Sequence, residues 1–413
     1  MNRTILHVDL NNFYASVECL YNPELKSVPV AVCGDVEARH GIVLAKNYPA
    51  KSLGIKTGEA IWQAKQKARN LVVVPPDFKK YLRFSRKARQ IYADYTDQIE
   101  PFGIDEAWLD VTGSTKMFGD GETIANQIRQ RMKDELGLTV SVGVSFNKIF
   151  AKLGSDMKKP DATTIIQKDN FKEFVWSLNI KELLYVGRST RNKLYSRNIN
   201  TIGDLANKDI HSLKLLLGNA WAETLWAFAN GYDSSPVRKI GEESIIKSIG
   251  NSTTAPRDLR NLDDVKIIIY VLSESIAARL RAQGLKCSTV TISIRDNELY
   301  SFERQSKLSD ATYTSKEIAK KAIEIFSKNY KWDRPIRSIG IRGADLVTES
   351  NNMQLDLFNP NKEKDEKVDK IIDNIRYRFG NDAICRASML ADIELSGFNP
   401  KDDHVIHPVS FFR

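Results

Sequence analysis

Three carboxylates are the first candidates for chemistry in this chain. Asp9 interrupts the apolar run TILHVDL, and Asp105 and Glu106 are adjacent at the start of a second apolar run. A buried carboxylate is costly unless it is paired or bound to metal. Singly, Asp9 could have a structural role and the Asp-Glu pair could lie on the surface. Together, the three suit two Mg²⁺ ions, which prefer carboxylate oxygens and support phosphoryl transfer.

Cationic and phenolic side chains that could bind phosphate lie in two further segments. Tyr48 and Lys51 are three residues apart, on one face if that segment is helical. Lys148, Lys152 and Lys159 lie within NKIFAKLGSDMKKP. Because a lysine ammonium binds phosphate well as a point charge, these residues predict a site for a phosphorylated substrate.

Short strands and helices must position these residues in the first 166 positions. Apolar or alternating runs predict strands, and amphipathic or basic runs predict helices. Strands are expected at 4–10, twice within 28–45, at 105–113 and at 138–146, and helices at 47–70, 79–96 and 122–136. Strands flanked by helices indicate an α+β domain with a sheet floor. Residues 168–232 read as helical and the polar segment after them reads as a linker.

From residue 244 onward the patterns predict the order β-α-β-β-α-β, a split βαβ unit with two helices on one face. Residues 244–345 carry 18 Lys+Arg against 12 Asp+Glu, two thirds of the net charge of +9. The free sheet face is expected to present arginines, depending on register, as a cradle for a nucleic-acid backbone. The candidates are Arg295, Arg304, Arg337 and Arg342.

The last region, 346–413, contains a charge run at 362–367 that predicts a solvated helix start. An apolar stripe follows at helical spacing and is typical of a helix face buried in a core. The stripe consists of Val368, Ile371, Ile372 and Ile375.

Composition excludes several classes of protein. The 413 residues are 42% hydrophobic and 27% charged, which is typical of a globular chain. The sequence has no run of about 18 apolar residues, so no membrane span is predicted. The four cysteines form no C-x-x-C pair, so neither zinc nor a disulfide framework is predicted. With an aspartate at position 9, the N-terminus does not read as a signal peptide, so a cytoplasmic, nucleoid-associated protein is expected.

Several blocks together resemble the signatures of Y-family DNA polymerases, with most similarity to the UmuC-like branch, the catalytic-subunit type of polymerase V. The blocks are HVDLNNFYASVE, LAKNYPAK, GIDEAWLD, SVGVSFNKIFAKLGSDMKKP and IHPVSFFR. The resemblance covers essentially the whole chain and implies an α+β right-hand architecture. It implies a palm (1–10 and 78–166), fingers (11–77), a helical thumb (167–233), a linker (234–243), a split-βαβ little finger (244–345) and a C-terminal tail (346–413).

The resemblance also implies roles for individual residues. Asp9, Asp105 and Glu106 would bind two Mg²⁺ ions with help from the Leu10 carbonyl, and Asp105 and Glu106 would be catalytic. Tyr14 would be the steric gate that rejects a ribose 2′-hydroxyl. The remaining implied residues are Tyr48, Lys51 and Lys159 for the triphosphate, Gly41 and Ile42 near the nascent base pair, and Val186, Gly187 and Arg188 for a DNA phosphate at a helix-hairpin-helix turn.

A peptide in the tail resembles the segment by which polymerases bind the sliding clamp. Its residues are Gln354, Leu355, Leu357 and Phe358. Primer-template DNA, deoxynucleoside triphosphates and a β-type sliding clamp are therefore the expected partners. A UmuD-like accessory protein or a recombinase filament is a further candidate partner.

The chain departs from the family pattern at four places. Gly103 and Ala162 replace a serine and a glycine, Lys51 replaces an arginine, and the thumb hairpin has one glycine where G-x-G is usual. Because no metal ligand is lost, a lesion-bypass polymerase remains the main hypothesis. A non-catalytic DNA- and clamp-binding factor is the alternative that the intact carboxylates disfavour. A nucleotide cyclase is disfavoured by the hairpin, the basic little finger and the clamp peptide.

Overall fold

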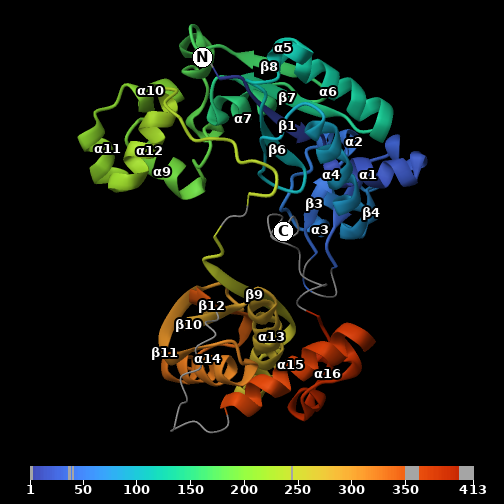
Figure 1. The fold of residues 1–413 in the computed structure, drawn as a ribbon, viewed down its shortest axis with the longest axis vertical. Coiled ribbons are helices and arrows are strands. Elements are labelled where there is room, and N and C mark those ends of the chain that lie inside the picture. Colours follow the sequence, from blue (N-terminus) through green and yellow to red (C-terminus); the bar gives the residue numbers. More distant parts are fainter. Residues whose placement is uncertain (1–2, 36–38, 40, 243–244, 349–361, 400–413) are drawn as a thin grey trace. The chain divides into compact units, whose positions relative to one another are not determined.

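The computed structural model describes residues 3–35, 39, 41–242, 245–348 and 362–399 (Figure 1). The chain forms two compact units. The first contains residues 1–34 and 42–243, and the second contains residues 35–41 and 244–405. The mixed α/β content and the order of the elements agree with the predicted fold class.

A five-stranded sheet in the order β5-β6-β1-β7-β8 forms the floor of the first unit. Its strands are β1 (Ile5–Leu10), β5 (Ile99–Pro101), β6 (Glu106–Asp110), β7 (Val140–Ser145) and β8 (Thr163–Ile166). The central strand β1 is antiparallel to both β6 and β7. All but one residue of β1 and all of β7 are buried, as their apolar patterns predict.

Helices cover both faces of this sheet, and the alternation of β1 decides which side chains each face receives. Leu6, Val8 and Leu10 join the core with helices α4 (Phe78–Ala93) and α6 (Gly121–Leu136). Ile5, His7 and Asp9 point to the other face, because successive strand residues alternate. That face receives α7 (Lys148–Met157), whose first turn is capped by Asn147.

The approach of α7 to the sheet depends on one glycine. A Cβ atom placed on Gly143 of β7 would lie 1.9 Å from the carbonyl oxygen of Ala151 and 2.5 Å from the amide nitrogen of Ser155. Both of these atoms belong to the backbone of α7, so no side-chain movement could relieve the contact. Gly143 therefore sets the distance between α7 and the face of the sheet to which Asp9 points.

The rest of the first unit consists of a small sheet and a group of helices. The small sheet has the order β3-β2-β4. Its strands and neighbouring helices are β2 (Val30–Cys33), β3 (Val43–Lys46), β4 (Val72–Val74), α1 (Phe13–Tyr21), α2 (Tyr48–Ser52) and α3 (Ile61–Lys67). After α5 (Thr115–Phe118), which lies beside α6, the helical segment comprises α8 (Phe171–Val175), α9 (Arg188–Tyr195), α10 (Ile202–Ala206), α11 (Ile210–Leu217) and α12 (Asn219–Ala229). These helices share an apolar core with Phe150 of α7.

The second unit has the predicted order β-α-β-β-α-β. Its elements are β9 (Ser248–Leu259), α13 (Leu262–Ala282), β10 (Leu285–Asp296), β11 (Ser301–Thr312), α14 (Ser315–Asn329) and β12 (Ile336–Thr348). The sheet order is β11-β10-β12-β9. Residues Ile292 and Ile294 of β10 and Ile339 and Ile341 of β12 lie in one core with both helices, so the opposite sheet face remains open.

The register of this sheet corrects one of the predicted arginines. Arg295 is paired with Ser338, and Arg342 with Thr291, on the face opposite the apolar core. Arg304 is paired with Ile292, a core residue. Directly paired residues share a face, so Arg304 lies on the helix side of the edge strand and not on the open face.

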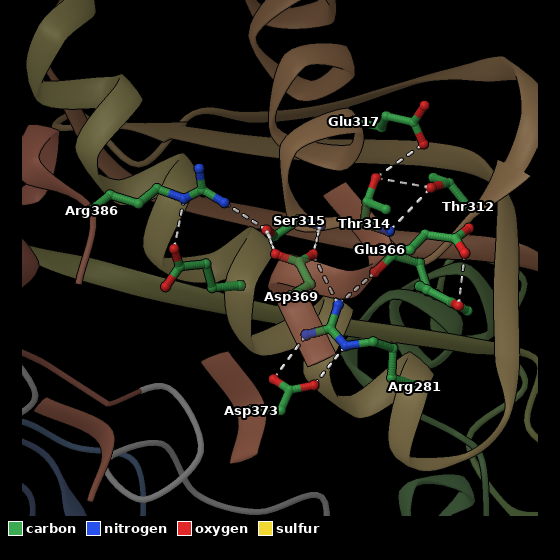
Figure 2. A network of polar contacts seen from close by, with 11 residues as sticks. Arg281, Thr312, Thr314, Ser315, Glu317, Glu366, Asp369, Asp373 and Arg386 are labelled. Carbon is green, nitrogen blue, oxygen red and sulfur yellow. Dashed lines mark hydrogen bonds and ion pairs between the residues drawn. The ribbon is translucent and has the colours of Figure 1, made fainter. Parts of the chain in front are cut away.

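The described part of the tail packs against the helices of the second unit (Figure 1). Its elements are α15 (Lys362–Phe379) and α16 (Ile393–Ser396), with short 3₁₀ turns between them. Figure 2 shows the polar network at this junction, where Arg281 of α13 donates to Asp369 at 3.0 Å and to Asp373 at 2.6 Å. Asp369 also accepts from the amide and hydroxyl of Ser315, the first residue of α14.

This junction contradicts the predicted core stripe of α15 at Val368 and Ile371, whereas Ile372 and Ile375 are partly buried. The acidic residues Glu366 and Asp369 are buried, whereas Val368 is 44% exposed and Ile371 is 59% exposed. The helix turns its acidic face inward because α13 presents Arg281 there, and Lys286 pairs with Glu366 at 3.4 Å. The predicted solvated start of this helix is therefore confirmed for Glu363, which is exposed, and wrong for Glu366, which is buried.

Candidate active site

Strand register brings the three carboxylates together. Asp9 of β1 is directly opposite Glu106 of β6, and direct partners share a face. The amide of Leu10 donates to the carbonyl oxygen of Asp105 at 3.0 Å, which joins the end of β1 to the start of β6. Two segments almost 100 residues apart thus place Asp9, Asp105 and Glu106 at one corner of the sheet.

Two lysines from the α7 region lie among these carboxylates. The Nζ atom of Lys152 is 2.6 Å from Glu106 and 3.5 Å from Asp9. The Nζ atom of Lys159 is 2.8 Å from Asp9, and both ammonium groups also pair with Asp156. Within the described ranges, no three Asp, Glu, His or Cys side chains are already arranged as a metal centre.

The pKa values of Asp105 and Glu106 are shifted in opposite directions. Burial, with the nearby charges of Glu106 and Asp9, raises the pKa of Asp105 to about 7. Burial also opposes ionisation of Glu106, but the hydrogen bond from His7 and the charge of Lys152 outweigh it and lower its pKa to about 2. With Asp156, the corner has four carboxyl groups beside two lysine ammonium groups. Hard oxygen donors with excess charge fit divalent Mg²⁺.

The raised pKa of Asp105 has a measurable consequence in metal-free protein. Its folded pKa of about 7 lies above the ordinary value of 3.8, so the folded state retains a proton that the unfolded chain releases. Folding stability must then fall as pH rises through that window. We expect the free energy of unfolding to drop by roughly 3 kcal/mol more in the native protein than in Asp105→Asn between pH 4.5 and 8. Urea denaturation with a chelator measures both; parallel pH profiles would contradict the assignment.

His7 and Ser155 are site residues that the sequence interpretation missed. His7 is fully buried, its Nδ1 lies 2.8 Å from Ser155 Oγ and its Nε2 lies 3.2 Å from Glu106 Oε2. Burial lowers the pKa of His7, and its ring lies between Ser155 and Glu106, where it can limit movement of the Glu106 carboxylate. Its position two residues before Asp9, hence on the same strand face, is the signal that could have revealed it.

Lys148 is not available for phosphate, contrary to the sequence-based expectation. Its Nζ lies 2.7 Å from Glu100 and 4.5 Å from the centroid of the Trp108 ring, in a buried position. Lys152 and Lys159 are the cations of this segment that reach the carboxylates.

The predicted nucleotide residues lie on α1 and α2. The ring of Tyr14 stacks on Tyr81 with centroids 4.3 Å apart and contacts Phe78 edge-on at 5.7 Å. Burial and the charge of Asp105 raise the pKa of Tyr14 to about 12. Burial also raises the pKa of Tyr48, which senses the charges of Lys159 and Asp9. Tyr14 and Tyr48 therefore lie near enough to Asp105 and Asp9 for the carboxylate charges to raise their pKa values.

The other residues predicted to contact nucleotide or the sliding clamp lie in different parts of the chain. Lys51 lies over the Tyr48 ring at 5.5 Å from its centroid. Ile42 is exposed and forms an isolated bridge with Ala60, whereas Gly41 groups with the second unit. The four clamp-peptide residues lie outside the described residues.

The thumb hairpin is only partly as predicted. Val186 is buried, and its amide donates to the carbonyl of Leu183 at 3.1 Å, so this amide is occupied within the hairpin. Gly187 and Arg188 are exposed at the first turn of α9, where amides have no intrahelical acceptor.

Comparisons with known proteins decide the family. The impB/mucB/samB family matches residues 8–156, its C-terminal domain matches residues 246–357, and the thumb domain of DNA polymerase-iota matches residues 181–233. DNA polymerase IV of Acetivibrio thermocellus is 57% identical over 394 residues, covering 95% of this chain and 98% of the relative. The chain belongs to the Y-family of DNA polymerases.

Two further comparisons agree with this membership of the Y-family. DNA polymerase IV 1 of Bacillus subtilis is 38% identical, covering 94% of each chain. A solved Y-family polymerase chimera, Dbh-Dpo4(243-245)-Dbh, has a TM-score of 0.72 and 27% identity, covering 84% of this chain and 99% of its own. None of the helices in the described part of this Y-family chain is long and apolar enough to cross a membrane.

Proposed function

We propose that this chain is a DNA-directed DNA polymerase that extends primers opposite and past damaged template bases. The observation that carries the proposal is the corner of Asp9, Asp105 and Glu106, with Lys152 and Lys159 beside it. Whole-length similarity to proteins named DNA polymerase IV supports it. Those names favour a polymerase IV type. The UmuC-like branch, with a UmuD-like protein or a recombinase filament as partner, stays a prediction.

Each residue of the corner has a role in the proposed chemistry. Asp9, Asp105 and Glu106, with the Leu10 carbonyl, would hold two Mg²⁺ ions. Bound Mg²⁺ supplies charge stabilisation to the attacking and leaving oxygens of phosphoryl transfer. His7, whose Nε2 lies 3.2 Å from Glu106 Oε2, would hold that carboxylate in position. Lys159, which pairs with Asp9 here, would bind the triphosphate together with Tyr48 and Lys51.

Two described surfaces are suited to primer-template DNA. In the second unit, Arg295 and Arg342 lie on the open sheet face. In the first unit, Gly187 and Arg188 lie at the exposed hairpin turn. Backbone amides and arginines contact phosphates without reading sequence. This mode suits an enzyme that must accept any template, and Arg337 at the β12 irregularity could add to it.

Tyr14 is proposed as the steric gate, and its substitution gives a direct test. We expect Tyr14→Ala to raise incorporation of ribonucleotides relative to deoxynucleotides by roughly 10–100-fold, since a ring no longer excludes the 2′-hydroxyl. Tyr14→Phe, which keeps the ring, is the matched control and should retain discrimination. Single-nucleotide insertion kinetics with both sugars measure the ratio. Equal discrimination in Tyr14→Ala and the native enzyme would place the gate elsewhere.

The peptide containing Gln354, Leu355, Leu357 and Phe358 is proposed to bind a β-type sliding clamp. The proposal rests on its sequence pattern and its place between the last sheet strand and α15. Primer extension by the double variant Leu357→Ala/Phe358→Ala, measured with the clamp present, should fall to the level seen without the clamp. If the clamp stimulates this variant normally, the segment is only a linker.

Primer extension on undamaged and abasic templates tests the proposed function itself. The native enzyme should add deoxynucleotides to both templates when Mg²⁺ is present and to neither when a chelator removes the metal. The alternative, a DNA- and clamp-binding factor without catalysis, would bind the same duplex but leave the primer unextended.

A further inference from the structure

The thumb hairpin contains an aromatic residue in a backbone conformation that favours glycine. Tyr185 has φ = +70°, and among the described residues it is the one aromatic side chain with a positive φ. Bulky side chains adopt this region rarely and at a steric cost. The position is the first of the two where the family usually has the glycines of G-x-G. The chain therefore keeps a tyrosine where glycine would be accommodated without strain.

The Tyr185 ring does little for the thumb core. It is 50% exposed, and its neighbours are Trp221, with ring centroids 6.1 Å apart, and Phe228 at 6.2 Å. Trp221 is itself 54% exposed. The buried residue of the hairpin is the adjacent Val186. An exposed pair of rings beside a strained backbone position is difficult to explain by packing alone.

The segment that follows this ring in the sequence is basic. Residues 185–197 contain four basic side chains and no acidic one. The four are Arg188, Arg191, Lys193 and Arg197. Tyr185 precedes by two residues the exposed turn at Gly187 that is proposed to hold a DNA phosphate. An apolar ring beside phosphate-binding groups complements the deoxyribose face of a nucleic-acid backbone.

We propose that Tyr185 packs its ring, with Trp221 beside it, against the sugar face of the primer-template duplex next to the phosphate held at Gly187. This inference rests on the proposed function, because it takes DNA as the ligand of the hairpin. The ring adds sequence-independent apolar contact, which a usual G-x-G hairpin lacks, and the strain at Tyr185 is the cost of presenting it.

The test separates strain from contact through two variants that both tolerate a positive φ. In Tyr185→Gly and Tyr185→Asn of the full-length protein, we expect the thermal unfolding midpoint to stay the same or rise, since strain is relieved. Affinity for a fluorescein-labelled primer-template duplex, measured by anisotropy, should fall about tenfold, the loss expected for roughly 50 Å² of apolar contact. Tyr185→Phe, which keeps the ring, should bind like the native protein.

Salt dependence gives a second readout, because a structural collapse of the hairpin would also remove its phosphate contact and make the salt slope shallower. The ring neutralises no phosphate, so the slope of log affinity against log salt should be unchanged in Tyr185→Gly. The proposal is overturned if Tyr185→Gly binds the duplex normally, if Tyr185→Phe binds as weakly as Tyr185→Gly, or if Tyr185→Gly lowers the unfolding midpoint. The readout is binding and not nucleotide addition, so its failure is distinguishable from failure of the polymerase proposal.

Discussion

Glu106→Gln is expected to lower the rate of nucleotide addition by at least about 10³-fold while primer-template affinity stays within about twofold of native. A loss of this size corresponds to about 4 kcal/mol of transition-state stabilisation, within the several kcal/mol that a bound metal can supply. The amide is nearly isosteric, so the strand pairing of Glu106 with Asp9 should persist. Single-turnover kinetics with saturating DNA and Mg²⁺ measure the rate, and anisotropy measures the affinity.

Asp156→Asn is the matched control for this experiment. Asp156 pairs with the same two lysines, Lys152 and Lys159, but is not a proposed metal ligand. Its substitution should slow addition by less than about tenfold. If Glu106→Gln extends primers as well as Asp156→Asn does, Glu106 is not a metal ligand and the corner works in another way.

Gly143→Ala is expected to be the most damaging substitution outside the carboxylate corner. A methyl group at this position would overlap the backbone of α7 at Ala151 and Ser155, so the helix must move away from β7. Overpacking of well-packed interiors typically costs about 1–3 kcal/mol, and overlap with backbone places this case at or above the upper end. We expect a loss of about 3 kcal/mol or more in urea denaturation.

Activity should fall with stability in Gly143→Ala, even in the fraction that remains folded. The displaced helix carries Lys152, which pairs with Glu106, and Ser155, which contacts His7. Gly113→Ala is the control, because nothing lies within 4 Å of a Cβ at Gly113 and its φ is not positive. A Gly143→Ala protein as stable and active as Gly113→Ala would show that α7 has room to move.

Periodicity in the sequence was sufficient for the parts of the fold built from near neighbours. The apolar runs that became β1, β6 and β7 and the β-α-β-β-α-β order are local patterns. They placed Asp9 and Glu106 on strands, and the register then set them opposite each other. His7 escaped notice because a histidine in an apolar strand reads as core, and its partner Ser155 is 148 residues away.

The errors lie where the pairing of one element with another decides the outcome. The stripe of α15 predicts a core face, but Asp369 is drawn inward by Arg281, 88 residues earlier in the chain. The face of Arg304 is set by the register of the β10–β11 hairpin, which pairs Arg304 with Ile292. Hydrophobic spacing within one element predicts neither relation, because each depends on which residue of a second element lies opposite.

The ion pairs that fasten α15 also make the described part of the tail a component of the second unit. Lys286 of β10 pairs with Glu366, and Arg281 of α13 pairs with Asp369 and Asp373. β12 ends at Thr348 and α15 begins at Lys362, and both of these residues belong to the second unit. Moving α15 away from this unit would require breaking these charge pairs, which is costly where the carboxylate is buried.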